Sequence, residues 1–285
     1  MQTRKAVFSG SWYPAEAQAC KALIREFLGG EKCPAPSEKP LVGGIVPHAG
    51  WFFSGAIACR VIHCLASGCA PNIDVVVVFG MHLHPGSSRY IMPEGQWETP
   101  FGPVPVDASL AEAITRRHVF EIETPSRFVQ DNTIEVQMPF IRYFFPDSRV
   151  VAMGVPPVVE TLNLATDLVS MASQMGLSIV VVGSTDLTHY GPNYRFTPKG
   201  QGSAALSWVR EENDRRVIEV MARMDPVAVL QEGIHHANAC CSGAAAAAIA
   251  AGKAMGADLA TTVAYATSYD KRPDDSFVGY AGMLF

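Results

Sequence analysis

Three short motifs place a histidine directly after a run of apolar residues. They are Pro47-His48-Ala49-Gly50, His82-Leu83-His84 and Asp186-Leu187-Thr188-His189. The runs before them are rich in β-branched residues, which is typical of buried strands. In an open α/β sheet the carboxyl ends of the strands face the crevice where ligands bind. We therefore expect histidines that are far apart in the sequence to lie around one site.

A cysteine is expected at the same site. Cys241 precedes Ser242-Gly243 and an alanine-rich run that is typical of a helix. The unpaired N–H groups at a helix N-terminus favour a thiolate, which could bind a metal or act as a nucleophile. Its neighbour Cys240 would point in a different direction in any regular structure, so we interpret Cys240 as a packing residue.

Two imidazoles and one thiolate, with an open coordination position, suit iron(II), copper or zinc. Magnesium and calcium are excluded as natural occupants because they prefer oxygen ligands. Alternation along an extended segment places His82 and His84 on the same side. The residues alone therefore leave open which of these two histidines contributes to the site.

Asp186 and His189 are candidates for acid/base chemistry. If a helix starts here, the two side chains share one helix face at positions i and i+3. A carboxylate beside an imidazole can fix its tautomer and raise its pKa, which suits a proton-transfer role. The simpler alternative is a helix-capping aspartate next to an exposed histidine.

Other residues near these motifs could support the site. Glu135 is a further carboxylate, although it could equally complete a helix cap with Asn132 three residues earlier, which is the simpler interpretation. Several aromatic residues could form the wall of a pocket for a planar or apolar ligand. These aromatic residues are Trp12, Tyr13, Trp51, Phe52, Phe53 and Tyr190.

The composition predicts a globular protein with a large core. The chain has 285 residues, of which 48% are hydrophobic and 17% charged, and its formal net charge is −5. Lysine and arginine are scattered, so a nucleic acid or an anionic membrane is not expected as the main partner. The first residues contain neither a signal-peptide core nor a spanning helix, so a cytoplasmic location is the default expectation.

The cysteines predict reduced thiols. Seven cysteines without paired CxxC spacing fit neither a disulfide framework nor a zinc knuckle. Most of them are expected to be small core residues. They are Cys20, Cys33, Cys59, Cys64, Cys69, Cys240 and Cys241.

Predicted strands and helices alternate along the chain. The strands are expected at Leu41 to Val46, Ile73 to Phe79, Arg149 to Val155, Leu177 to Val182 and Leu259 to Ala266. The helices are expected at Glu16 to Leu28, Gly55 to Ala66, Ala108 to Arg117, Val159 to Gln174, Ser203 to Met224 and Ser242 to Met255. This alternation predicts one α/β domain over residues 1–285, with a mainly parallel or mixed central sheet flanked by helices. The segment from Tyr90 to Val106 is expected to be irregular or a small antiparallel excursion that could wall the crevice.

Together these motifs resemble the MEMO family, also called AmmeMemoRadiSam system protein B. The resemblance covers nearly the whole chain, and it depends on the order and spacing of short motifs. These are Gly10-Ser11-Trp12-Tyr13-Pro14, Pro47-His48-Ala49-Gly50, the Gly80 to Arg89 loop, Ile134-Glu135 with Pro139, Ser184 to Gly191, the Cys241 helix start and Val278-Gly279-Tyr280.

The resemblance implies a fold similar to the LigB-type class III extradiol dioxygenases. It implies two histidines and a cysteine where those iron enzymes use two histidines and a glutamate. Carried over by motif, His48, His84 and Cys241 match the metal ligands, and Asp186 with His189 matches a pair that lines the pocket. Alignment of the downstream Ser88-Arg89 favours His84, with His82 as the alternative, and family patterns often have histidine where Asn132 and Gln137 stand.

The leading functional hypothesis is a metal-dependent redox protein or oxidoreductase that holds iron or copper, with zinc as a further candidate. In this hypothesis His189, oriented by Asp186, moves protons for a small-molecule or peptide ligand in a pocket that includes Trp12 and Phe53. One alternative is a non-catalytic module that binds a peptide or protein in the same crevice. The other is a metal-free Cys/His nucleophilic enzyme that uses Cys241 and His189. The resemblance also implies protein A and the radical SAM enzyme of the AmmeMemoRadiSam system as partners.

Overall fold

The computed structural model describes residues 1–29, 33 and 39–285. Its central sheet contains nine strands, which are β2 (Gly43–Val46), β3 (Val75–Gly80), β4 (Tyr90–Ile91), β7 (Glu121–Ile122), β8 (Arg149–Gly154), β9 (Ile179–Ser184), β10 (His189–Tyr190), β11 (Thr261–Thr267) and β12 (Phe277–Leu284). The strands lie in the order β10-β12-β2-β9-β3-β8-β4-β7, and β11 pairs with β12. The central strands β2, β9, β3 and β8 are parallel, whereas β12 and β4 are antiparallel to β2 and β8. The predicted α/β fold with a mixed, mostly parallel sheet is therefore confirmed.

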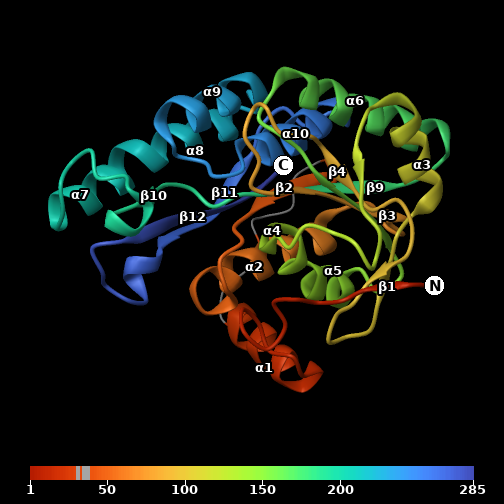
Figure 1. The fold of residues 1–285 in the computed structure, drawn as a ribbon, viewed down its shortest axis with the longest axis horizontal. Coiled ribbons are helices and arrows are strands. Elements are labelled where there is room, and N and C mark those ends of the chain that lie inside the picture. Colours follow the sequence, from red (N-terminus) through yellow and green to blue (C-terminus); the bar gives the residue numbers. More distant parts are fainter. Residues whose placement is uncertain (30–32, 34–38) are drawn as a thin grey trace.

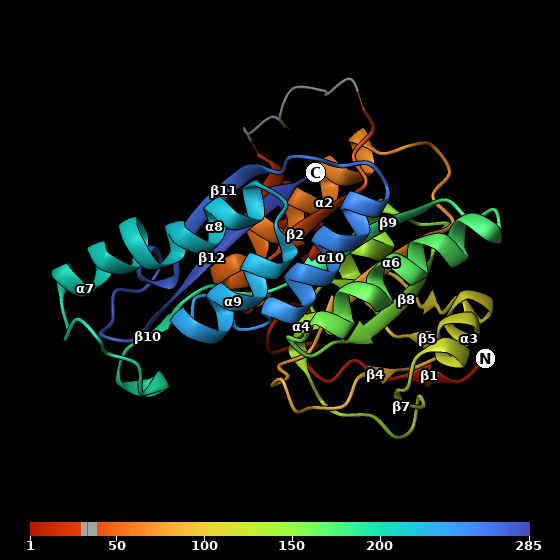
Figure 2. The ribbon, with the colours of Figure 1, turned by 90° about the horizontal axis from the view of Figure 1, so that it is seen from above.

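Helices cover both faces of this sheet. They are α1 (Ala17–Leu28), α2 (Ala56–Gly68), α3 (Ala108–Arg117), α4 (Asn132–Glu135), α5 (Met138–Phe144), α6 (Val159–Gln174), α7 (Ser203–Trp208), α8 (Asp214–Ala222), α9 (Pro226–His236) and α10 (Ser242–Ala254). One face carries α6, α9 and α10, and the other carries α2 with α4 and α5 (Figure 1). Seen from above, α10 lies between α9 and α6 over the centre of the sheet (Figure 2).

The sequence predicted most of the longer elements; the short helices α4 and α5 were not predicted, and three longer elements also differ. The helix expected from Ser203 to Met224 is interrupted by a π-helical turn at Val209–Asn213, which separates α7 from α8. The helix α9 and the strand β12 were not predicted. In β12 all eight residues are buried, so the polar alternation that marks a half-exposed strand is missing.

A small separate sheet forms beside the central one. It contains β1 (Thr3–Arg4), β5 (Gln96–Trp97) and β6 (Val104–Pro105), and β5 and β6 are antiparallel. The expected antiparallel excursion between Tyr90 and Val106 is thus confirmed.

Two of the seven cysteines are not reduced. Cys33 and Cys64 form a disulfide that joins a loop to α2, and the prediction of free thiols is wrong for this pair. The pairing spans 31 residues of sequence and depends on where the loop returns to the helix, which spacing alone does not reveal. The other five cysteines are free.

The helical stretch from Trp51 to Gly68 is apolar and long enough, by composition, to cross a membrane. Within the fold, α2 packs against β2, β12, α1 and α5, and residues such as Val61, Ile62 and Leu65 are fully buried there. Burial in the core therefore accounts for its composition.

Close packing of α10 on the sheet explains its run of alanines. Every residue from Ser242 to Gly252 is buried. Beneath the helix, a Cβ atom added at Gly183 of β9 would come within 2.8 Å of the Ala244 carbonyl oxygen and 2.9 Å of the Ala248 Cβ. Glycine in the strand and alanine in the helix therefore let the two backbones approach each other. Since Cys241 directly precedes α10, this packing also fixes one end of the site.

The variant Gly183→Ala is expected to lower the free energy of unfolding by about 1 to 3 kcal/mol, because the new methyl group has no space between β9 and α10. Urea unfolding measures this change as a lower midpoint. The matched control is Gly86→Ala, at which an added Cβ meets nothing within 4 Å, and its effect is expected to stay within about 0.5 kcal/mol. Equal midpoints for both variants would contradict the close-packing explanation.

Candidate metal centre

The parallel strands deliver three segments to one edge of the sheet. In the register, Val46 of β2 lies opposite Ser184 of β9, and Phe79 of β3 lies opposite Gly183. The chain leaves β2, β9 and β3 at the same level. The histidine and aspartate motifs that follow these strands are therefore neighbours in space, as the sequence predicted.

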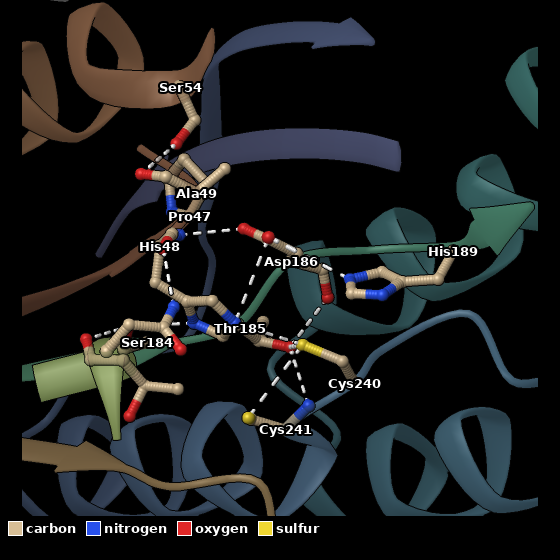
Figure 3. Close-up of polar contacts among 12 residues, drawn as sticks. Pro47, His48, Ala49, Ser54, Ser184, Thr185, Asp186, His189, Cys240 and Cys241 are labelled. Atoms are coloured by element: carbon tan, nitrogen blue, oxygen red, sulfur yellow. Dashed lines mark hydrogen bonds and ion pairs between the residues drawn. The ribbon is translucent and has the colours of Figure 1, made fainter. Parts of the chain in front are cut away.

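Four side chains from these segments and from the start of α10 form a compact cluster. The possible ligand atoms of His48, His82, Cys240 and Cys241 all lie within 4.8 Å of one another. The Cys240 Sγ lies 3.2 Å from His48 Nε2 and 3.8 Å from the Cys241 Sγ, and the sulfur atoms lie side by side (Figure 3). A tetrahedral ion with bonds of about 2.0 to 2.3 Å holds its ligand atoms roughly 3.3 to 3.8 Å apart. The two Cys240 distances are close to this spacing, and the cluster as a whole, within 4.8 Å, is slightly wider.

The cluster contains His82 and not His84. The rings of His48 and His82 meet edge to face with centroids 4.9 Å apart. His84 is exposed, and its backbone N–H is bonded to Ser87 Oγ in a turn of the loop. The structure thus places His84, which the motif alignment favoured, outside the cluster, and His82, the alternative, within it.

Cys240 is a member of the cluster, and its interpretation as a packing residue is wrong. The expectation assumed regular structure, but both cysteines precede the first helical residue, Ser242, and Cys241 is the N-cap residue of α10. Hydrogen bonds from Cys240 N to the Asp186 carbonyl and from Cys241 N to Thr185 Oγ1 shape this irregular segment. Successive side chains can therefore face the same point.

A serine hydroxyl selects the tautomer of His48. The Ser184 hydroxyl donates its single hydrogen to the Thr133 carbonyl at 2.7 Å. It must then accept the hydrogen bond from Nδ1–H of His48, at 3.1 Å. His48 in its neutral form consequently presents the lone pair of Nε2 toward Cys240, as a metal ligand requires.

An aspartate selects the tautomer of His82 in the same way. Asp131 Oδ2 accepts hydrogen bonds from both the backbone N–H and Nδ1 of His82, at 3.1 and 3.0 Å. Burial lowers the pKa of His82, but these bonds and the Cys240 thiol outweigh it and raise the pKa to about 10. The same contacts hold the pKa of Asp131 well below its usual range, against the effect of burial. Asp131 also caps α4 through Thr133 N, so one carboxylate fixes both the helix and the histidine.

The two cysteines differ in charge. Burial disfavours a thiolate at both positions, but contacts with Cys241, His48 and His189 lower the pKa of Cys240 well below its ordinary value. Burial and the charge on Cys240 raise the pKa of Cys241. The cysteine whose pKa is lowered is thus Cys240, one residue before Cys241, at which the sequence predicted the thiolate.

The Asp186 carboxylate lies between two imidazoles (Figure 3). Its Oδ1 accepts a 2.7 Å hydrogen bond from the backbone N–H of His48, and its Oδ2 lies 3.9 Å from His48 Nε2 and 3.8 Å from His189 Nε2. Burial lowers the pKa of His189, but Asp186 and Cys240 outweigh it and raise the pKa to about 10. Burial likewise opposes protonation of His48, whose pKa Asp186 and Cys240 nevertheless raise.

No helix begins at Asp186 in this described segment, so both the shared-face and the helix-cap interpretations of Asp186 and His189 are wrong. The chain instead runs irregularly from β9 into β10. The His189 Nε2 is buried without a hydrogen-bond partner among the described residues. It faces the Asp186 carboxylate, with Oδ2 at 3.8 Å.

A cleft of about 690 Å³ opens in front of the cluster. Trp12 and Phe53 line it, together with His48, His82, Asp186 and His189. Further aromatic and charged side chains complete the lining, namely Phe52, Tyr194, Tyr280, Arg272 and Asp274. The segment from Tyr90 to Val106 contributes no residue to the lining, so the expectation that it walls the crevice is wrong.

Glu135 holds the N-terminal segment in place. Its carboxylate accepts hydrogen bonds from the backbone of Val7 and Phe8 and from the Tyr13 hydroxyl. The residue that caps α4 is Asp131, so the proposed cap between Glu135 and Asn132 is wrong. By anchoring this segment, Glu135 positions Trp12 at the rim of the cleft.

Two amides support the β2 end of the site. Asn132 Nδ2 donates to the His48 carbonyl and Gln137 Nε2 to the Pro47 carbonyl, each at 2.8 Å. Together with Asp131 and Ser184, these residues complete the surroundings of the two histidines. Sequence reasoning missed Asp131 and Ser184 as partners of the histidines. The signal in the sequence was their position, since Asp131 directly precedes a short helix and Ser184 ends a buried strand.

The fold and the cluster define an α/β protein with a possible His2Cys2 metal site at the carboxyl edge of its sheet. Residues 4–284 match the family model described as Memo-like protein. The chain belongs to this family, which confirms the resemblance found in the sequence.

Several related proteins match over nearly the whole chain. The chain is 31% identical to a MEMO1 family protein of Methanopyrus kandleri, over 99% of this chain and 98% of that protein. It is 32% identical to a MEMO1 family protein of Pyrobaculum arsenaticum, over 100% of this chain and 99% of that protein. A crystal structure of an uncharacterized protein from Escherichia coli K12 is similar in fold, with a TM-score of 0.54 and 12% identity. The match covers 86% of this chain and 99% of that one.

The pair of His82 and Asp131 predicts a pH-dependent stability in metal-free protein. The pKa of His82 is raised from 6.5 to about 10, so its contribution is fully present below pH 6.5 and is lost as the pH rises toward 10. The variant Asp131→Asn should lower this pKa, which NMR titration of the His82 ring measures, and flatten the fall in melting temperature over that range. The surface variant Glu94→Gln serves as the control. An unchanged His82 titration in Asp131→Asn would show that the carboxylate does not govern this ring.

Proposed function

We propose that this protein is a metal-dependent redox protein or oxidoreductase that holds one iron or copper ion between His48, His82, Cys240 and Cys241. The observation that carries the proposal is the convergence of these four donors within 4.8 Å. The hydrogen bonds of Ser184 and Asp131 support it, because they occupy Nδ1 of each histidine and direct both Nε2 atoms inward.

The donor set supports a transition metal. Imidazole and thiolate ligands suit iron, copper and zinc, and a cluster without a carboxylate donor does not suit magnesium or calcium. Iron or copper, when bound, would supply one-electron chemistry at the base of the cleft, whereas zinc would not. We include in this proposal a fold similar to that of the LigB-type dioxygenases. Because cysteine stands where those enzymes have glutamate, cleavage of catechol rings is not expected.

His189 and Asp186 are proposed to handle protons for a ligand in the cleft. His189 lines the cleft, and Asp186 stabilises its charged imidazole from 3.8 Å away. The aromatic side chains of Trp12 and Phe53 would bind an apolar part of a small molecule or peptide. Association with protein A and the radical SAM enzyme of the system remains a prediction from the family.

One observation favours a second candidate, a metal-free nucleophilic enzyme. Cys240 Sγ lies 3.2 Å from His48 Nε2, which is the spacing of a thiolate and imidazolium pair. In this version the nucleophile is Cys240 rather than Cys241, and metal content has no effect on reactivity with a substrate.

Titration of metal-free, untagged protein with iron(II) or copper(I) under anaerobic conditions tests the proposal. Competition with a chromophoric chelator gives the dissociation constant. Loss of a residue that only supports a ligand weakens binding by about 10- to 100-fold, so His82→Ala and Cys240→Ser are expected to weaken it by about 100-fold or more.

The matched control is His84→Ala, because His84 lies on the same loop and outside the cluster. It should bind metal as the unmodified protein does. Thermal stabilisation by the metal gives an independent measure, since it grows with the ratio of metal concentration to dissociation constant. If His84→Ala loses binding while His82→Ala keeps it, the cluster is not the metal site. If neither metal binds and alkylation of Cys240 abolishes turnover, the nucleophilic candidate replaces it.

A further inference from the structure

A second cavity lies on the other side of Cys240. Its volume is about 420 Å³, and its lining includes Cys240, His189, Tyr194, Arg195, Phe196 and Ala237. Cys240 is half-buried and lines this cavity, whereas it is absent from the lining of the main cleft. Cys240 therefore borders a cavity that differs from the proposed substrate cleft.

A thin wall separates the two cavities. His189 and Tyr194 line both of them, and their rings are in contact with centroids 4.9 Å apart. A molecule in the second cavity would approach Cys240 past this pair of rings. It would not need to displace a ligand that occupies the cleft at Trp12 and Phe53.

The second cavity favours an anion. Its lining contains the guanidinium of Arg195 and the imidazole of His189 and no carboxylate. Arg195 is exposed and makes no ion pair with any residue in the described part of the chain. The main cleft differs, because it contains Asp186 and Asp274 beside its Arg272. An exposed guanidinium without a partner attracts and orients a carboxylate.

We propose that the second cavity binds an anionic low-molecular-weight disulfide, which exchanges with Cys240 and thereby regulates the metal centre. Binding and exchange of the disulfide do not depend on the proposed function. Only the regulation of the metal centre rests on it. The cavity offers Arg195 for a carboxylate of the disulfide, Phe196 for its apolar part and the Cys240 sulfur for the exchange.

The exchange balances without a further reactant. The Cys240 sulfur forms a bond to one sulfur of the small disulfide, the disulfide bond breaks, and its other sulfur leaves as a thiolate with the bonding electron pair. Cys240 reacts as the thiolate, and the leaving thiolate takes up one proton from the imidazole of His48, whose Nε2 lies 3.2 Å from the Cys240 sulfur. One mixed disulfide and one small thiol are formed, and excess thiol reverses the reaction.

The modification removes one of the four donors. A sulfur bonded to another sulfur no longer provides a thiolate, so the centre retains His48, His82 and Cys241. Metal occupancy is then expected to depend on the ratio of small disulfide to small thiol around the protein.

The test treats metal-free protein with oxidised glutathione and follows the modification of Cys240 by peptide mass mapping. We expect Arg195→Gln to slow the reaction by about threefold to tenfold, and the difference to shrink at high ionic strength. Cystamine, a cationic disulfide, should react no more slowly with Arg195→Gln than with the unmodified sequence. The matched variant is Arg272→Gln, which removes a guanidinium from the main cleft and should leave the rate with oxidised glutathione unchanged.

The inference is overturned if Cys240 is not modified, if another cysteine reacts instead, or if Arg272→Gln slows the reaction and Arg195→Gln does not. The rates are measured without metal, so they do not depend on the proposed function. Metal titration of unmodified protein tests that function separately. A modified protein that binds metal as tightly as the unmodified protein would reject the regulatory consequence, and restored binding after treatment with thiol would support it.

Discussion

The parallel register of β2, β9 and β3 is the constraint on which the site depends. Because these strands end at the same level, the chain places His48, Asp186 and His82 at one edge, although they are up to 138 residues apart. The helix α10 closes the remaining side of the site. Its alanines and Gly183 of β9 allow it to lie close to the sheet. A shift of one strand by a single residue would turn its side chains to the opposite face and separate the donors.

The same constraint explains what the sequence could predict. Runs such as Val75 to Val78 are buried on both faces and are unmistakable as central strands, so the sheet and the convergence of the motifs follow from pattern alone. The choice between His82 and His84 did not follow, because it depends on Asp131 on another segment, which bonds Nδ1 of His82. Cys241 does lie in the cluster as predicted, but the role of Cys240 was missed for a related reason, since regular side-chain alternation does not apply to the irregular residues before α10.

Tertiary hydrogen bonds therefore decide the chemistry of the individual donors. Ser184 has one hydrogen to give, and because Thr133 receives it, the tautomer of His48 is fixed. Nothing in the local sequence around Ser184 indicates that the Thr133 carbonyl lies beside it. Interactions of this kind link residues across the fold, and sequence patterns record only the elements that carry them.

The four donors differ in their exposure to solvent. His48, Cys240 and Cys241 stand on the packed edge of the sheet and the start of α10, whereas about 41% of the His82 side chain is exposed, on the loop that follows β3. An arriving ion would thus meet a nearly preformed three-donor platform, and the loop would close the coordination sphere last. Exchange of the ion with solvent would then begin at His82, the most exposed of the four donors, while the other three stay shielded.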